Sequence, residues 1–265
     1  MAGDDRLYDR YDNSVVIVSE MIFGAGHMSP GGPDGVRAIV EGLDLAGKTV
    51  LDIGCAIGGI DVQLATEFDC RVVGVDIEPG LIDIGRARIA AAGLADRVDL
   101  RLVEPGPLPF DDAAFDVVFG KDSWLLIDDK PAFFAELHRV LRPGGSIAAS
   151  EWMGDGAPPS AAMQAYFELR GMAYHLETAA SYEAMLRAAG FTDVTVADTS
   201  DVRREQPRAC CDAMAGPLRA PMIAAIGAAR HEGFLTQWRA LAGLFEAGEL
   251  RAGQLRGAKP NERAA

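Results

Sequence analysis

The stretch Val50–Gly59 reads VLDIGCAIGG and decides the fold. An apolar run ends in the acidic residue Asp52, and three glycines follow it within seven residues. A buried strand that enters a glycine-rich turn and then a helix is typical of a ligand-binding edge of a sheet. Ala56 stands where a dinucleotide-binding turn has its second glycine, and its methyl group would crowd a pyrophosphate. The turn therefore favours a nucleotide-like ligand that places no phosphate against it, and it disfavours NAD and FAD.

Short apolar segments alternate with helical ones downstream of this turn. We predict strands at 49–53, 71–75, 98–103, 116–120, 145–151, 193–198 and 253–259, and helices near 58–68, 79–92, 131–140 and 181–189. The run LRPGG at 141–145 is predicted to be a turn between a helix and a strand. This alternation predicts an α/β fold, a Rossmann-like doubly wound sheet of seven mostly parallel strands. Ligands of such sheets bind at the carboxyl ends of the strands.

The remaining segments predict helices that cover those strand ends. We expect one domain over residues 1–265, in which 45–152 is the ligand-binding core and 253–259 the last strand. An N-terminal helical lid is expected at 1–32, with Tyr8 and Tyr11, and it ends in the loop FGAGHMSPGG. A helical cap is expected from 155–178, with a helix at Met163–Tyr174, and from the long alanine-rich stretch at 205–248.

Composition and charge exclude several classes of function. The chain has 265 residues and a net charge of −14, so its surface repels phosphate backbones and nucleic-acid binding is not expected. No apolar run reaches the ~18 residues that a membrane span needs. The acidic N-terminus is unlike a secretory signal, and we expect a cytoplasmic protein. The four cysteines form no C-x-x-C pair, and no cluster has metal-ligand spacing, so we predict no metal.

Three acidic residues follow three of the predicted strands. Asp52 supplies negative charge beside the turn, where a sulfonium would be favoured over a phosphate. Asp76 ends the strand in VVGVDIEPG, where a carboxylate accepts bonds from both hydroxyls of a ribose. Glu104 follows the third strand and is placed to accept from an adenine amino group.

Together these motifs resemble those of class I methyltransferases that use S-adenosylmethionine (SAM). The matching elements are VLDIGCAIGG, VVGVDIEPG, LPF followed by FDVVF, and LRPGG, which occur in the family's order over about residues 45–155. The resemblance implies a SAM pocket, with S-adenosylhomocysteine as the product. Its implied lining is Asp52, Gly54, Asp76, Ile77 and Glu104. Ala56 and Glu104 depart from a frequent glycine and a frequent aspartate.

The N-terminal segment resembles that of phosphoethanolamine and other small-amine N-methyltransferases. The similarity is carried by Tyr11, the run VIVSEMIFG and the loop FGAGHMSPGG. It implies a lid that places Tyr11 over the acceptor and brings Met28 and Ser29 to SAM. In FGKDSWLLI, Lys121 is expected beside the cofactor, and Asp122 is expected to orient or deprotonate the acceptor. The histidine that partners this acid in the family is Leu126 here.

The same resemblance implies an acceptor site in the cap. It places Trp152, Tyr166 and Arg170 at the acceptor, and it places Arg256 at a family lysine. Tyr166 and Arg170 are four residues apart and share a helix face. Arg170 with Arg256 suits a phosphate or carboxylate, and two surface ion pairs are the alternative.

A ring set is made of Tyr11, Trp152, Tyr166 and Tyr174. These rings suit a cationic amine, with core packing as the alternative. His27 and His175 are further candidate bases.

These residues predict a SAM-dependent methyltransferase of a small molecule. The acceptor atom expected is an amine nitrogen of a phosphobase or an amino-acid-like compound. An O- or C-methyltransferase of secondary metabolism is the alternative, and a SAM-binding module without turnover is a third hypothesis. We expect no nucleic-acid or membrane partner, and a monomer or homodimer.

Overall fold

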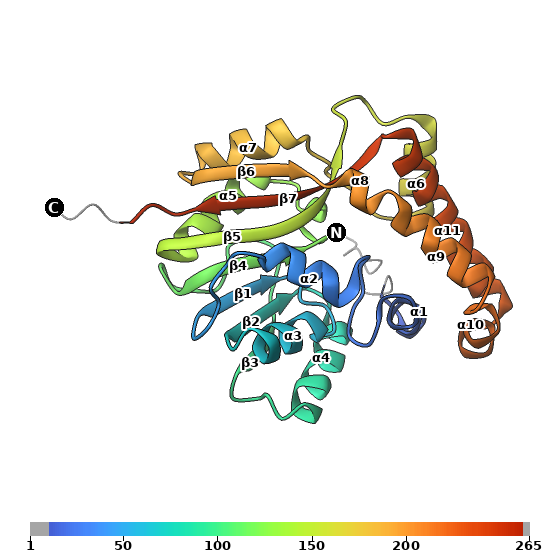
Figure 1. Cartoon of the computed structure of the whole chain (residues 1–265), viewed down its shortest axis with the longest axis horizontal. Helices are drawn as coiled ribbons and strands as arrows, with labels where there is room; N and C mark the ends of the chain where they lie inside the picture. Colours follow the sequence, from blue (N-terminus) through green and yellow to red (C-terminus); the bar gives the residue numbers. More distant parts are fainter. Residues whose placement is uncertain (1–10, 262–265) are drawn as a thin grey trace, which may run out of the picture.

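The computed structural model describes residues 11–261, which form a seven-stranded sheet between two layers of helices (Figure 1). The sheet order is β3-β2-β1-β4-β5-β7-β6. The strands are β1 (Thr49–Ile53), β2 (Arg71–Asp76), β3 (Val98–Leu102), β4 (Phe115–Lys121), β5 (Leu141–Gly154), β6 (Thr192–Asp198) and β7 (Leu250–Ala258). The pairs among β1 to β5 are parallel, and β7 runs antiparallel to both β5 and β6. This architecture confirms the predicted fold class.

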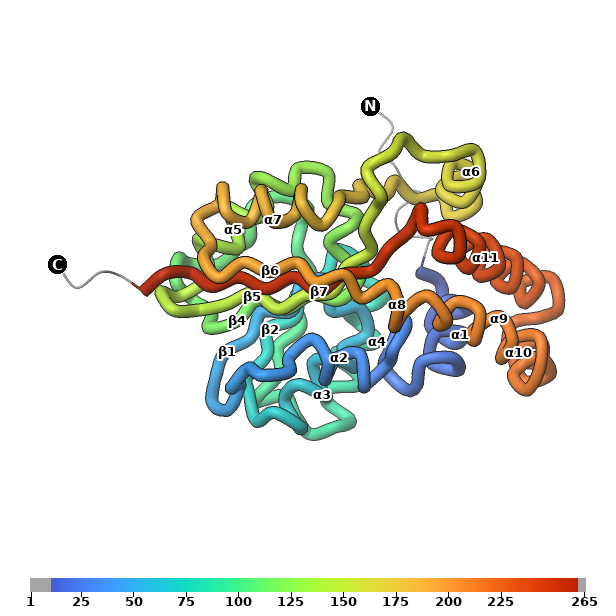
Figure 2. The backbone as a smooth tube through the Cα atoms, turned by 45° about the horizontal axis from the view of Figure 1, so that its top comes forward, coloured from blue at the N-terminus to red at the C-terminus, as the bar shows by residue number. Residues whose placement is uncertain are grey.

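Apolar side chains join the helices to both faces of the sheet (Figures 1 and 2). One face is covered by α2 (Gly32–Val40), α3 (Gly59–Glu67) and α4 (Pro79–Ala91), and the other by α5 (Lys130–Val140) and α7 (Ala179–Ala188). Ile39 and Leu64 pack with Val50 in the first layer, and Phe134 and Tyr182 pack with Val118 in the second. Burial of large apolar side chains on both faces explains the near-continuous apolar runs of β1 and β4.

A third group of helices gathers at the carboxyl ends of the parallel strands (Figure 1). It comprises α1 (Asn13–Phe23), α6 (Ala161–Arg170), α8 (Ser200–Arg203), α9 (Glu205–Ala215), α10 (Arg219–Ile226) and α11 (Ala228–Ala247). Val18 of α1 packs with Met214, Met222 and Phe234, so the N-terminal helix and the C-terminal insertion form one apolar cluster. The short helix η1 (Trp124–Leu126) follows β4 in the chain.

Several predicted boundaries differ from those of the structure. The stretch 205–248, which was predicted to be helical, comprises three helices, because Pro217 follows Gly216 and Gly227 has a φ of +81°. The cap helix ends at Arg170 instead of Tyr174, because Gly171 is left-handed at the C-cap. The run LRPGG lies within β5, which begins at Leu141 and is irregular between Phe115 and Val117 of its partner strand. The helix α8 was not predicted, and β7 spans 250–258 instead of 253–259.

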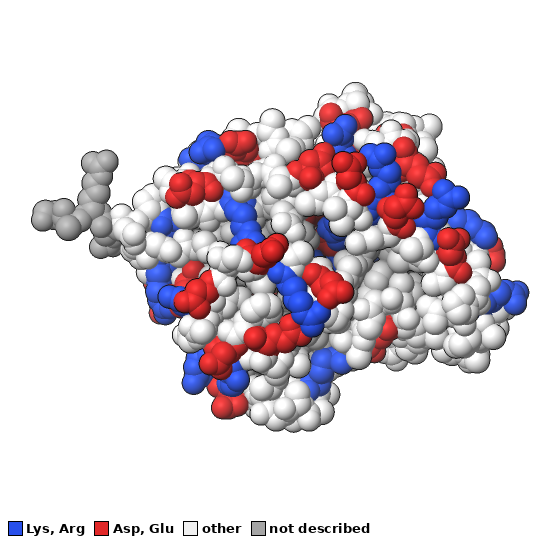
Figure 3. All heavy atoms as spheres, in the orientation of Figure 1, with Lys and Arg blue, Asp and Glu red and all other residues white. Residues whose placement is uncertain are grey.

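The surface carries both signs of charge. On the face seen in Figure 3, Lys and Arg side chains are interspersed with Asp and Glu. Within residues 11–261, no helix is both long enough and apolar enough to cross a membrane. Tyr8 and the other residues of 1–10 lie outside the described part of the chain.

Candidate active site

The glycine-rich turn is tied to the end of the neighbouring strand. Gly54 has a φ of +86° and Ala56 a φ of +49°, so the turn uses left-handed backbone at both residues. The Ala56 N–H donates to Asp76 Oδ2 at 2.9 Å, and the Glu78 N–H donates to Asp76 Oδ1 at 3.0 Å. Each oxygen keeps a lone pair for a ligand hydroxyl. Ala56 therefore adopts a conformation that the family's glycine would reach with less strain.

Two buried acids, Asp52 and Asp61, and the partly buried Asp76 make the site beneath this turn suitable for a cation. Burial raises the pKa of Asp52 well above its usual range, and the charges of Asp61 and Asp76 raise it further. Burial also raises the pKa of Asp61 to about 7. Both carboxylate oxygens of Asp61 and Oδ2 of Asp52 lack hydrogen-bond partners within the described chain. Mutual repulsion among these acids favours a positively charged ligand and opposes a phosphate, which fits SAM.

Asp61 was not singled out by the sequence, because it lies inside the helix that follows the turn. Ile77 lies 37% exposed after Asp76, and Glu104 is exposed in the loop after β3. Both therefore remain accessible to a ligand at the strand ends.

The N-terminal segment closes over the turn. Tyr11 and Met28 pack against a cluster that contains Ile57, Ala56 and Leu81. Burial raises the pKa of Tyr11 to about 12, so its phenol stays protonated at neutral pH. The lid role of this segment stays a prediction.

Lys121 secures the loop that follows the lid helix. Its side chain is 1% exposed, and its ammonium donates to Ser29 Oγ at 2.5 Å and to the Pro30 carbonyl at 2.7 Å. Burial lowers the pKa of Lys121 to about 8. Lys121 was expected beside the cofactor; in the structure its ammonium donates to the lid loop and forms an ion pair with Asp122 Oδ2 at 3.6 Å.

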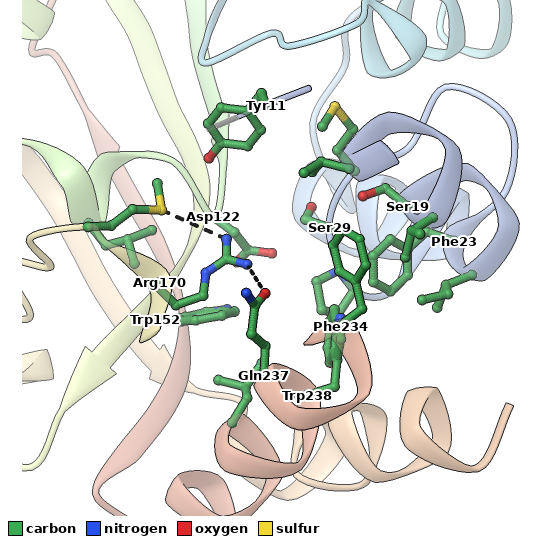
Figure 4. Close-up of a pocket in the computed structure, with 18 of the residues that line it drawn as sticks. Tyr11, Ser19, Phe23, Ser29, Asp122, Trp152, Arg170, Phe234, Gln237 and Trp238 are labelled. Carbon is green, nitrogen blue, oxygen red and sulfur yellow. Dashed lines mark hydrogen bonds between the residues drawn. The ribbon is translucent and has the colours of Figure 1, made fainter. Parts of the chain in front are cut away.

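A cavity lies between the lid, the end of β4 and the cap (Figure 4). It brings together eight of the predicted site residues: Tyr11, Met28, Ser29, Asp122, Trp152, Tyr166, Arg170 and Tyr174. They come from segments separated by up to 163 residues of sequence, from position 11 to position 174. In Figure 4, Tyr11, Asp122 and Arg170 point toward a common space, with Gln237 of α11 beside Arg170.

Asp122 is held in an unusual backbone conformation at the floor of this cavity. Its φ is +56°, which costs a non-glycine residue about 1–2 kcal/mol, and its N–H donates to the Ser150 carbonyl. Arg203 of α8 donates to both carboxylate oxygens, at 3.0 Å to Oδ1 and 2.7 Å to Oδ2. Burial alone would raise the pKa of Asp122, but Arg203 and Lys121 outweigh it and hold that pKa below its usual range. Asp122 is therefore a stable carboxylate and a weak base.

Glu151 of β5 orders the backbone that follows Asp122. This fully buried side chain accepts the N–H groups of Ser123, Trp124 and Leu125 at 3.1, 2.8 and 2.9 Å. Burial, with the charge of Asp122, raises the pKa of Glu151 to about 8. Neither Glu151 nor Arg203 was predicted. The sequence offers one signal for each: Glu151 is an acid inside an apolar strand, and Arg203 lies in an arginine-rich run after β6.

Arg170 provides a positive charge that no carboxylate neutralises among residues 11–261. Its guanidinium donates to Tyr174 Oη at 3.2 Å and to Gln237 Oε1 at 3.0 Å. Tyr174 stacks on both Tyr166 and Trp152, with ring centroids 6.1 and 6.3 Å apart. These rings therefore pack largely against one another and support Arg170.

Three of the residues predicted to act in catalysis or acceptor binding do not line the cavity: His27, His175 and Arg256. His27 is buried, and burial, with the charge of Lys121, lowers its pKa. His175 pairs with the exposed Asp128 at 3.1 Å, outside the cavity. Arg256 donates to the Glu41 carbonyl at the end of α2, so the structure does not bring it to Arg170. All three expectations came from positions along the chain, which do not report where a side chain points.

The fold and this site define a class I methyltransferase domain. A family model described as a methyltransferase domain matches residues 50–145. The chain is similar to phosphoethanolamine N-methyltransferases. It is 37% identical to phosphoethanolamine N-methyltransferase 1 of Arabidopsis thaliana over 202 residues, which are 75% of this chain and 40% of that protein. It is 31% identical to a phosphoethanolamine N-methyltransferase of Triticum aestivum over 97% of this chain and 51% of that one.

Solved structures share this fold. Phosphoethanolamine N-methyltransferase 2 of Haemonchus contortus, in complex with phosphomonomethylethanolamine and S-adenosylhomocysteine, superposes with a TM-score of 0.89 at 24% identity. The match covers 96% of this chain and 59% of that one. The chain spans about half the length of the curated relatives it matches.

Proposed function

We propose that the protein transfers a methyl group from SAM to an amine nitrogen of a small molecule that carries an anionic group. The observation that carries this proposal is the cavity in which the lid residue Tyr11, the strand-end carboxylate of Asp122 and the unneutralised Arg170 face one another. The similarity to phosphoethanolamine N-methyltransferases, over three quarters of the chain, supports the same reaction class.

The cofactor would be held by the strand ends. Asp76 would accept from its ribose hydroxyls, with Ile77 and Glu104 on the adenine side. Asp52, Gly54, Met28 and Ser29 would surround its amino-acid end. When bound, SAM supplies a methyl group on a positively charged sulfur, which suits the acid-rich turn. The lid and its Lys121 contacts would exclude water, and this exclusion protects the methyl group from hydrolysis.

The acceptor would lie between Arg170 and Asp122. The Arg170 guanidinium binds phosphate or carboxylate through charge-assisted hydrogen bonds, and this contact orients the opposite end of the molecule toward the lid. Tyr11 would cover the acceptor as a neutral phenol. Methyl transfer is an in-line displacement, so correct placement of the acceptor supplies much of the rate enhancement.

Methylation of oxygen or carbon is the second candidate. It is favoured by Leu126, which lines the cavity where the related amine enzymes are expected to have a histidine. A leucine cannot remove the proton from a protonated amine, whereas an acidic phenol or carbon acid can lose its proton to water before transfer.

One experiment separates these functions. The purified protein is mixed with SAM and, in separate reactions, with phosphobases, amino acids, phenols and carbon acids, and S-adenosylhomocysteine release is measured. We expect release with anionic amines. Release with phenols or carbon acids alone would replace the amine proposal, and binding of SAM without any release would indicate a non-catalytic module. Light scattering would decide between the predicted monomer and homodimer, and cell fractionation would test the expected cytoplasmic location.

A further inference from the structure

Besides Lys121, a second positively charged side chain, that of Arg203, contacts the Asp122 carboxylate. Arg203 does not line the main cavity; it lines a smaller hollow that shares Pro30 and Trp152 with it. Its side chain is 12% exposed, and that of Asp122 is 3% exposed. Ser150 Oγ also donates to Asp122 Oδ1 at 3.3 Å, and Lys121 Nζ lies 3.6 Å from Oδ2. Asp122 is therefore neutralised by the protein itself before any acceptor binds.

The charge around the reacting end of the cavity is consequently positive. Arg203 and Lys121 both pair with Asp122, and Arg170 lines the same cavity. Asp122 is the single carboxylate that lines this cavity in the described chain, because Asp52, whose charge also acts on Lys121, lies outside its lining. The neighbouring Glu151 is fully buried, and all its bonds go to backbone N–H groups. An alkylammonium group brought to this point would enter a region of like charge. Like charges in a partly buried site repel each other strongly.

An apolar wall makes up much of the rest of the cavity lining. It is formed by side chains of α1, η1 and α11: Val15, Val18, Ile22, Phe23, Leu125, Leu126, Phe234, Trp238 and Leu241. Leu125 and Leu126 follow Asp122 by three and four residues in the chain and line the same cavity, so the apolar wall reaches the reacting end. A short, fully polar acceptor would leave this wall without contacts, whereas an apolar or aromatic body would cover it.

We infer that Arg203 is a positioning residue that sets acceptor specificity. Because it neutralises Asp122, it restricts the site to anionic acceptors whose amine nitrogen is uncharged before methyl transfer, such as anionic aromatic amines. This inference rests on the proposed function. The acceptor nitrogen uses its lone pair to bond the methyl carbon, and the S–C bond breaks with its electron pair remaining on sulfur. The nitrogen then carries the positive charge and releases one proton to water, so Asp122 need not act as a base.

The test compares two phosphate-bearing acceptors. In 2-aminoethyl phosphate the amine is protonated at neutral pH, like a lysine, whereas in 4-aminophenyl phosphate it is uncharged. The ratio of their kcat/KM values is measured in the wild type, in Arg203→Gln and in Arg203→Lys. Arg204→Gln is the matched control, because Arg204 is the next residue and its side chain is 47% exposed. Calorimetry with both acceptors and S-adenosylhomocysteine gives binding without turnover.

We expect the wild type to prefer 4-aminophenyl phosphate at least tenfold, in both kcat/KM and affinity. Arg203→Gln should shift this ratio about tenfold toward 2-aminoethyl phosphate. A tenfold shift corresponds to ~1 pKa unit of interaction between the charge of residue 203 and the acceptor ammonium. Arg203→Lys and Arg204→Gln should keep the wild-type ratio. The double variant Arg203→Gln, Asp122→Asn should restore the preference, because it removes both charges.

Equal use of the two acceptors by the wild type would overturn the inference, and this result needs no variant to fold. A ratio unchanged in a folded Arg203→Gln would also overturn it. A different outcome would overturn the proposed function: methylation of oxygen or carbon acceptors without methylation of the nitrogen of either amine.

Discussion

Gly54→Ala tests the role of the turn that opens the cofactor site. An added Cβ would lie 2.4 Å from Ser123 Cβ and 2.6 Å from Ser123 Oγ, closer than non-bonded atoms approach. Ser123 cannot move freely, because its hydroxyl donates to the Ile53 carbonyl at 2.7 Å. The positive φ costs about 1–2 kcal/mol, and displacing Ser123 costs about 1–3 kcal/mol. We therefore expect a loss of about 2–5 kcal/mol in the free energy of unfolding.

Two other glycines separate these contributions. Gly93 has a φ of +67° and open space around its missing side chain, so Gly93→Ala should show the backbone cost alone. Gly80 lies in α4 with open space and no positive φ, so Gly80→Ala should stabilise the protein by about 0.5–1 kcal/mol. Ser123→Gly, added to Gly54→Ala, removes the colliding atoms and should recover only the steric part.

Urea unfolding measures these differences as shifts of the midpoint at constant slope. Calorimetry with SAM then shows whether the displaced Ser123 also weakens the cofactor site beside it. The reasoning is refuted if Gly54→Ala costs no more than Gly93→Ala, or if Ser123→Gly recovers nothing in the double variant.

Three further predictions concern single side chains. Arg170→Met should raise the KM for anionic acceptors about 100-fold, the loss of ~3 kcal/mol of charge-assisted bonding, while calorimetry shows unchanged SAM affinity. Asp76→Asn should weaken SAM binding about 30-fold by calorimetry, because it loses charged hydrogen bonds worth ~2 kcal/mol. Burial lowers the pKa of Lys121 from 10.5 to about 8, so between these pH values the folded protein binds fewer protons than the unfolded chain. As pH rises through this window, the free energy of unfolding of the wild type should therefore increase by up to ~3 kcal/mol relative to that of Lys121→Met. Urea unfolding at several pH values between about 8 and 10.5 measures this difference, and the absence of an increase would contradict the burial of Lys121.

The sheet and the cofactor turn were predictable because their signals are local. The run VLDIGCAIGG contains the strand, the turn and the start of α3 in ten consecutive residues, and β1 was predicted with both ends correct at 49 and 53. Asp76 was placed correctly at the end of β2 for the same reason. Apolar runs report burial in a parallel sheet directly, and glycines report the positive φ that a tight turn needs.

The acceptor side was predicted less well, because its residues come from separate segments. Arg256 and Arg170 were expected together, yet Arg256 bonds to α2. Chain position places a residue on a strand. The register of that strand and the packing of the cap decide which residues its side chain contacts. The same limit applies to His27 and His175.

Local patterns in this chain were therefore enough for the sheet and for the class of enzyme, because each of those signals lies within about ten residues of chain. The electrostatics of the site arise from packing instead. Arg203 meets Asp122 across 81 positions of sequence, and Lys121 meets Ser29 across 92. Whether a buried carboxylate acts as a base or as a neutralised anchor depends on which charges fold against it.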